Sequence, residues 1–242
     1  MRSELLAQKK ITRRRPPRFE LIAGALCLDF INTLDDRFSS EPKELLKSYL
    51  DLARFGEDTG ILSDLPVDRL MTKSMQYPEG AQSALESAIR LREAMYEVFW
   101  ALVQKKPVPR APLMILNGYV KDAAQHMNVV SRDGHFEWEF DSTDSDFDAP
   151  LWPIARSAAD LLASEQVHFV RACASKTCEW LFLDESKNHR RRWCDMTKCG
   201  NRAKVKSFYT RQKKTSKLDD GKRHSPRRTQ RFTKESKTRT PS

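Results

Sequence analysis

The chain has 242 residues, of which 39% are hydrophobic and 31% charged, and its formal net charge is +10. This length allows one large domain, or a medium-sized domain with a small appendage. No apolar run reaches the roughly 18 residues of a membrane span, and the first residues lack the apolar core of a secretory signal. We therefore expect a cytoplasmic protein whose five cysteines are reduced thiols.

The charge is distributed unevenly along the chain. Residues 1–18 hold seven Lys and Arg against one acidic residue, and residues 19–170 hold 14 against 25. Residues 171–202 hold eight against four, and residues 203–242 hold 14 against three. Basic ends on an acidic body indicate an acidic partner such as nucleic acid. The alternative is that the terminal Lys and Arg residues only keep the protein soluble.

The chain opens with a basic arm and a first apolar segment. Residues 1–18 are basic and interrupted by proline, which predicts a disordered arm. The apolar run of residues 21–34 fits both a strand and a helix face, so its periodicity leaves the two open. Asp29 and Asn32 lie inside this run, where burial requires hydrogen-bond partners. We expect them to cap or fix a turn, with ligand contact as the alternative. Cys27 is expected in the core.

Apolar residues at helical spacing predict five helices in the acidic body. They cover about residues 41–59, 65–75, 78–103, 113–127 and 152–163. Arg92 interrupts the apolar stripe of the longest of these helices. We expect it to reach the surface along its apolar stem, and the alternative is an inward arginine that binds an anionic ligand.

A β-hairpin is predicted between the last two of these helices. Residues 135–140 alternate strictly in polarity, and Asp133-Gly134, a pair typical of tight hairpin turns, separates them from residues 128–132. The acidic residues 141–148 lack the order of a calcium loop, so we expect a solvated loop. Residues 166–171 have the pattern of a strand that leads into a group of cysteines.

Four cysteines form two pairs of equal spacing, and fifteen residues separate the pairs. Such an arrangement can place four thiolates around one ion in the tetrahedral geometry of a closed structural zinc site. We therefore predict one structural Zn²⁺ bound by Cys173, Cys178, Cys194 and Cys199. His189 is the alternative ligand, but four thiolates already complete the shell. Since only about 30 residues surround the site, the ion should supply much of the folding free energy.

The sequence between and after the cysteine pairs predicts a hairpin and a helix. Residues 180–184 and 190–193 have the composition of two short strands joined by a loop, and their aromatic residues would cluster beside the ion. Gly200 allows a tight turn after the last cysteine, and Asn201 is a suitable N-cap for a following helix.

Two stretches resemble known protein families. Arg171-Ala-Cys173, Cys178–Asp184, Arg191–Met196 and Cys199-Gly-Asn-Arg202 resemble the CGNR zinc finger, over about residues 169–212. Leu26–Leu34 resembles the opening of the ABATE-type domain, which precedes this finger in stress-induced transcription regulators of bacteria. The resemblance implies a DNA-binding regulator.

The residues give an independent reason to expect nucleic-acid binding, because several phosphates neutralised by Lys and Arg make binding strong and salt-dependent. Basic residues gather on the predicted loop and the following helix, and the candidate contacts are Arg190, Arg191, Arg192, Lys198, Arg202, Lys204, Lys206, Arg211, Lys213 and Lys214. Arg202 could instead pack over the aromatic residues of the finger.

The sequence therefore predicts an α+β protein that is mostly α. Its expected parts are a basic disordered arm (1–18), an ABATE-type helical domain with a small hairpin (19–168), a zinc finger of hairpin plus helix (169–214) and a basic disordered tail (215–242). The expected function is a zinc-containing transcription regulator that binds duplex DNA, with an N-terminal domain that senses a small ligand or forms a homodimer.

Two other classes of function remain open. The first is a zinc-stabilised protein that binds RNA or the ribosome. The second is an enzyme with a pocket in residues 19–170, which we do not expect because the sequence shows no catalytic triad, phosphate-binding glycine loop or paired catalytic carboxylates.

Overall fold

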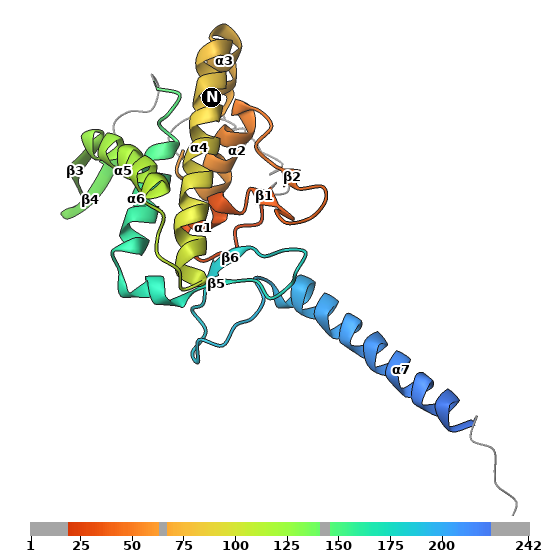
Figure 1. Cartoon of the computed structure of the whole chain (residues 1–242). Coiled ribbons are helices and arrows are strands. Elements are labelled where there is room, and N and C mark those ends of the chain that lie inside the picture. Colours follow the sequence, from red (N-terminus) through yellow and green to blue (C-terminus); the bar gives the residue numbers. More distant parts are fainter. Residues whose placement is uncertain (1–18, 63–66, 141–145, 224–242) are drawn as a thin grey trace, which may run out of the picture. The chain divides into compact units, whose positions relative to one another are not determined.

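The computed structural model of the chain describes residues 19–62, 67–140 and 146–223 (Figure 1). The described residues form helices and three two-stranded antiparallel sheets, which confirms the mostly α, α+β class. The chain divides into two compact units, Met1–Gly200 and Asn201–Ser242. The predicted arm and the acidic residues 141–145 lie outside the described residues, as does the tail beyond residue 223.

The main elements of the first unit are helices. They are α1 (Leu26–Ile31), α2 (Tyr49–Thr59), α3 (Val67–Gln76), α4 (Pro78–Val103), α5 (Arg110–Gln125) and α6 (Leu151–Leu162). The long helix α4 runs through the middle and contacts α1, α2, α5 and α6 (Figure 1). Pro78 suits its first turn, where no intrahelical N–H bond is lost. Across the described residues, no helix is both long and apolar enough to cross a membrane.

The helix predicted from residue 41 begins later, at Tyr49. Ser48 and Asp51 form a capping box, which fixes the start of α2 by satisfying backbone donors of its first turn. The preceding residues form the strand β2 (Lys43–Glu44), which pairs with β1 (Leu34–Asp35). The predicted end is confirmed, because Gly60 adopts the left-handed conformation with φ 77° after α2. The apolar run that fitted both a strand and a helix contains α1.

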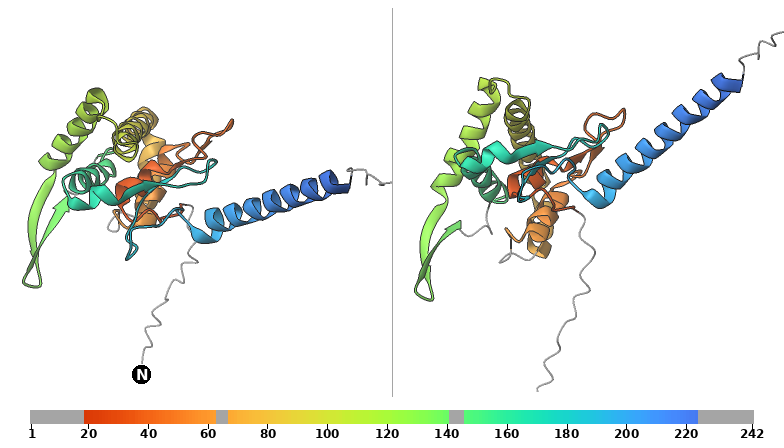
Figure 2. Two further views of the ribbon diagram at one scale, coloured as in Figure 1. Left: turned by 60° about the horizontal axis from the view of Figure 1, so that its bottom comes forward. Right: turned by 90° about the horizontal axis from the view of Figure 1, so that it is seen from below.

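The predicted hairpin is confirmed as β3 (Met127–Arg132) and β4 (His135–Phe140). Asp133 and Gly134 have φ values of 51° and 82°, which a two-residue turn of this type requires. The hairpin extends away from the helices (Figure 2). Phe136 and Trp138 on β4 are 79% and 58% exposed.

The segment that contains the four cysteines, called the zinc module below, packs into the core of the helices. β5 (Val170–Ala172) follows the 3₁₀ helix η2 (Glu165–Phe169) and pairs with β6 (Leu181–Leu183). The predicted strand at residues 190–193 is wrong. The main-chain groups of β6 are already bonded to β5 on one side and to Asn32 and Ala23 on the other.

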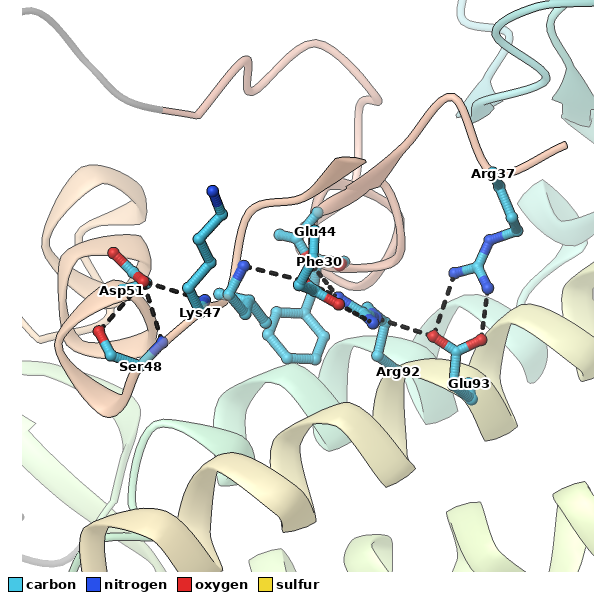
Figure 3. A network of polar contacts seen from close by, with 10 residues as sticks. Phe30, Arg37, Glu44, Lys47, Ser48, Asp51, Arg92 and Glu93 are labelled. Atoms are coloured by element: carbon cyan, nitrogen blue, oxygen red, sulfur yellow. Dashed lines mark hydrogen bonds and ion pairs between the residues drawn. The ribbon is translucent and has the colours of Figure 1, made fainter. Parts of the chain in front are cut away.

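The expectation that Arg92 reaches the surface is also wrong. Its side chain is 2% exposed and lies in a network of polar contacts (Figure 3). The guanidinium donates to both carboxylate oxygens of Glu44 at 2.6 and 2.7 Å, to Glu93 at 2.9 Å and to the hydroxyl of Thr33 at 3.2 Å. Burial is tolerated because each of the three guanidinium nitrogens has an acceptor, which a sequence pattern alone does not show.

Candidate zinc centre and basic surfaces

The four predicted cysteines come together in one buried cluster. Their sulfur atoms all lie within 4.8 Å of one another. The Sγ atoms of Cys178 and Cys194 are 3.5 Å apart, and those of Cys194 and Cys199 are 3.8 Å apart. Four sulfurs bound tetrahedrally to zinc at about 2.3 Å would lie about 3.8 Å from one another. The cluster therefore has the dimensions of a closed tetrathiolate zinc site.

Short main-chain turns position the four thiols. Cys173 follows β5, and its N–H donates to the carbonyl of Trp180 at 2.8 Å. Cys178 ends a turn in which its N–H bonds to Ser175. Cys199 lies in a π-helical turn (Met196–Gly200), in which the N–H of Gly200 bonds to the carbonyl of Asp195. Each pair of cysteines thus flanks a compact turn that brings both sulfurs to one point.

Gly200 closes this turn next to the side chain of Met196. A Cβ atom at Gly200 would meet the end of that side chain, which is flexible and 53% exposed, so packing alone does not require a glycine here. The predicted turn at Gly200 is present as the last residue of the π-helical turn. The helix α7 (Asn201–Arg223) includes Asn201 as its first residue, rather than beginning after it as the predicted N-cap.

The donor set fits a zinc ion. Burial, together with the charge of the neighbouring Cys173, raises the pKa of the Cys199 thiol. A raised pKa favours the neutral thiol, so four buried cysteines become thiolates together only when a divalent cation offsets their charge. When bound, Zn²⁺ would neutralise and crosslink these groups, and its complete sulfur shell leaves no open position for catalysis.

His189 is held away from a ligand role. Its Nδ1 lies 2.8 Å from the carbonyl oxygen of Asp184, and its ring stacks on Phe169 with centroids 3.8 Å apart. The fifth cysteine, Cys27, is fully buried in α1, and burial raises the pKa of its thiol to about 12. Its position confirms the predicted core role.

The zinc module is bonded to the N-terminal domain through groups that the sequence did not pair. The side chain of Asn32 bonds to both main-chain groups of Leu181, and the indole N–H of Trp180 donates to Asp35 at 2.8 Å. The N–H of Leu183 donates to the carbonyl of Ala23 at 2.7 Å. In the sequence, the position of Asn32 inside an apolar run indicated that its side chain needs a hydrogen-bond partner. That partner, Leu181, lies 149 residues along the chain, so the sequence did not identify it.

Asp29, the other polar residue of that run, fixes a turn as expected. Its carboxylate accepts a hydrogen bond from the N–H of Ala23 at 2.9 Å. Burial raises its pKa to about 6, in spite of the opposing hydrogen bonds from Ala23 and Ile22.

Arg191, a predicted nucleic-acid contact, is bonded within the module. Its guanidinium donates to the carbonyls of Trp193, Cys194 and Ile22 and lies 4.5 Å from the ring centroid of Phe182. The main-chain N–H of Arg191 donates to the carboxylate of Asp184, a residue that is only 1% exposed. The side chain therefore closes the loop between the cysteine pairs against the N-terminal domain.

The other predicted basic residues of the first unit are exposed. Arg190 and Lys198 lie on the surface, where Lys198 forms an ion pair with Glu20. Arg192 is exposed as well, with its guanidinium 5.2 Å from the ring centroid of Trp193.

The second unit carries the remaining predicted contacts on α7. Four of them have exposed side chains: Arg202, Lys204, Lys206 and Arg211. Lys213 and Lys214 are helical, but their side chains lie outside the described residues. The helix extends to Arg223, so the start of the predicted basic tail is helical.

Comparison with known families assigns most of the chain. Residues 24–165 match the ABATE family, described as "Putative stress-induced transcription regulator", and residues 170–212 match the CGNR zinc finger. No curated protein matches the chain. Because the first match covers more than half of the sequence and the second contains all four clustered cysteines, the chain belongs to the ABATE family and carries a CGNR zinc finger with one structural zinc site.

Proposed function

We propose that this protein is a transcription regulator that binds duplex DNA through exposed basic residues of its zinc finger. The observation that carries the proposal is the series of exposed cations on the first part of α7, where none of the described side chains from residue 201 to 212 is buried. Such a surface neutralises phosphates and releases counterions, which accounts for binding without any base contact.

The zinc centre has a structural role in this proposal. Its four thiolates hold both ends of the loop between the cysteine pairs, on which Arg190 and Arg192 are exposed. The side chain of Arg191 stabilises the same loop through its hydrogen bond to the carbonyl of Trp193. We propose a binding protein in which the zinc ion itself takes no part in catalysis, since a closed sulfur shell leaves no open position for a substrate at the metal.

The N-terminal domain is proposed to sense a ligand or to form a homodimer. Support for dimer formation comes from the hairpin β3–β4, which extends from the helices and exposes Val129, Phe136 and Trp138 on one face. Support for a ligand comes from an open groove of about 750 Å³ lined by Lys73, Tyr77 and Phe147.

The test is binding of the full-length zinc-loaded protein to duplex DNA, duplex RNA and single strands at rising salt. We expect the DNA affinity to fall steeply with salt, and Lys204→Ala/Lys206→Ala to reduce that slope by about two. The double variant Lys105→Ala/Lys106→Ala, at exposed lysines of the acidic body, is the matched control and should leave the slope unchanged. A preference for RNA regardless of sequence would instead support the RNA-binding alternative.

A further inference from the structure

Helix α7 carries an exposed apolar stripe that phosphate binding leaves unexplained. Val205, Phe208 and Tyr209 are 55%, 58% and 60% exposed. Their spacing of three and four residues places them on one face of the helix. The rings of Phe208 and Tyr209 contact each other edge to face, with centroids 5.8 Å apart. A solvated basic helix has no need of such a stripe, so it indicates a surface for contact.

Cations flank this stripe on both sides. At about 100° per residue, Arg202 and Lys206 lie along one border of the stripe, and Lys204 and Arg211 lie along the other. All four side chains are exposed. Antiparallel or parallel pairing of two such stripes would bring like charges together at both borders, which disfavours a second copy of α7 as the occupant. The charge favours a polyanion with an apolar or aromatic centre.

The major groove of duplex DNA is a polyanionic surface with apolar groups along its centre. It admits one α-helix, with phosphates on both walls and base edges along its floor. The one apolar group on that floor is the 5-methyl group of thymine. Duplex RNA fits less well, because its major groove is too deep and narrow for side chains to read, and its uracil lacks the methyl group.

We propose, on the basis of the function proposed above, that α7 lies in the DNA major groove with its apolar stripe against thymine methyl groups. The cations at the two borders of the stripe contact the phosphates of the two strands. Val205 and Phe208 are then specificity residues for thymine-containing sites. Tyr209 can add a hydrogen bond to a base edge through its hydroxyl.

The test uses two duplexes of alternating A·T pairs that differ only in the methyl group, one with thymine and the other with deoxyuridine in its place. We expect the full-length zinc-loaded protein to bind the thymine duplex more tightly, by about fourfold for each methyl buried. Val205→Ala/Phe208→Ala should abolish the difference. Ser207→Ala, at an exposed position outside the stripe, is the control and should preserve it. Zinc content and helical circular dichroism establish that each variant is folded.

The outcomes separate this inference from the proposed function. Equal, salt-dependent affinity of the wild-type protein for both duplexes would overturn the role of the stripe and leave DNA binding intact. Absence of binding to every duplex would overturn both proposals. If the stripe variant weakens binding to both duplexes equally, or converts a dimer into a monomer in sedimentation, the stripe does not read methyl groups.

Discussion

Asn32 binds Leu181 through both of its amide atoms, across 149 residues of sequence. Its Nδ2 donates to the carbonyl of Leu181 at 2.9 Å, and its Oδ1 accepts from the N–H of Leu181 at 3.1 Å. The amide side chain thus takes the place of a neighbouring strand at the free side of β6. This contact makes the zinc module and the helical domain parts of one core, although they match two separate families.

Replacing Asn32 by Ala should destabilise the first unit by about 2–4 kcal/mol, because two buried main-chain groups of Leu181 lose their partner. Urea unfolding followed by circular dichroism measures the change. Asn117→Ala, at an exposed position of α5, should change the stability by about 0.5 kcal/mol or less. Equal stabilities of the two variants would show that the amide contact contributes nothing.

Cys178→Ser and Cys199→Ser should each abolish stoichiometric zinc binding, because the site has four ligands and no replacement lies beside it in the part of the chain described. Since the module shares its core with the helices, we also expect the whole first unit to unfold more easily, and not the finger alone. Metal analysis and thermal unfolding are the measurements. Cys27→Ala, which alters only the core of α1, should retain one zinc per chain. A fully reduced wild-type protein without zinc would contradict the structural site.

Glu44→Gln should cost about 3 kcal/mol, since it removes the negative charge and one of the two oxygens that accept from the buried guanidinium of Arg92. Denaturant unfolding gives the difference. Glu41→Gln, on the exposed segment just before β2, is the matched control and should be close to neutral. A near-neutral Glu44→Gln would mean that the charge of Glu44 is not needed to keep Arg92 buried.

Asp29 should make the protein less stable as the pH rises from about 4 to about 6. Burial raises its pKa in the folded protein from 3.8 to about 6, so the folded state holds its proton more tightly than the unfolded state. That preference is fully present below the unfolded pKa and is lost as the pH rises through the folded one. Asp29→Asn removes the titration and keeps an oxygen for the N–H of Ala23. The difference in stability between wild type and variant should change across this interval and be constant above pH 7, which unfolding at several pH values measures. A pH-independent difference would place the pKa of Asp29 in its ordinary range.

Local chemistry was sufficient to predict several elements. Pro78 and a wide apolar stripe predicted α4, and the Asp133-Gly134 pair predicted the β3–β4 hairpin, because these signals act within a few residues. The spacing of the four cysteines predicted the zinc site for the same reason, since each pair needs only a short turn.

Contacts between distant segments could be decided only by the tertiary structure. The burial of Arg92 depends on Glu44, which β2 brings to it. The predicted start of the helix at residue 41 was wrong, because the Ser48–Asp51 capping box outweighed the apolar periodicity. The main-chain groups of Leu181 that bond to Asn32, and the carbonyl of Ile22 that accepts from Arg191, are likewise supplied by distant segments of the chain. Every residue carries a backbone carbonyl, and every residue except proline carries a backbone N–H. A sequence can therefore show that a polar side chain needs a partner, but only the fold shows which one it has.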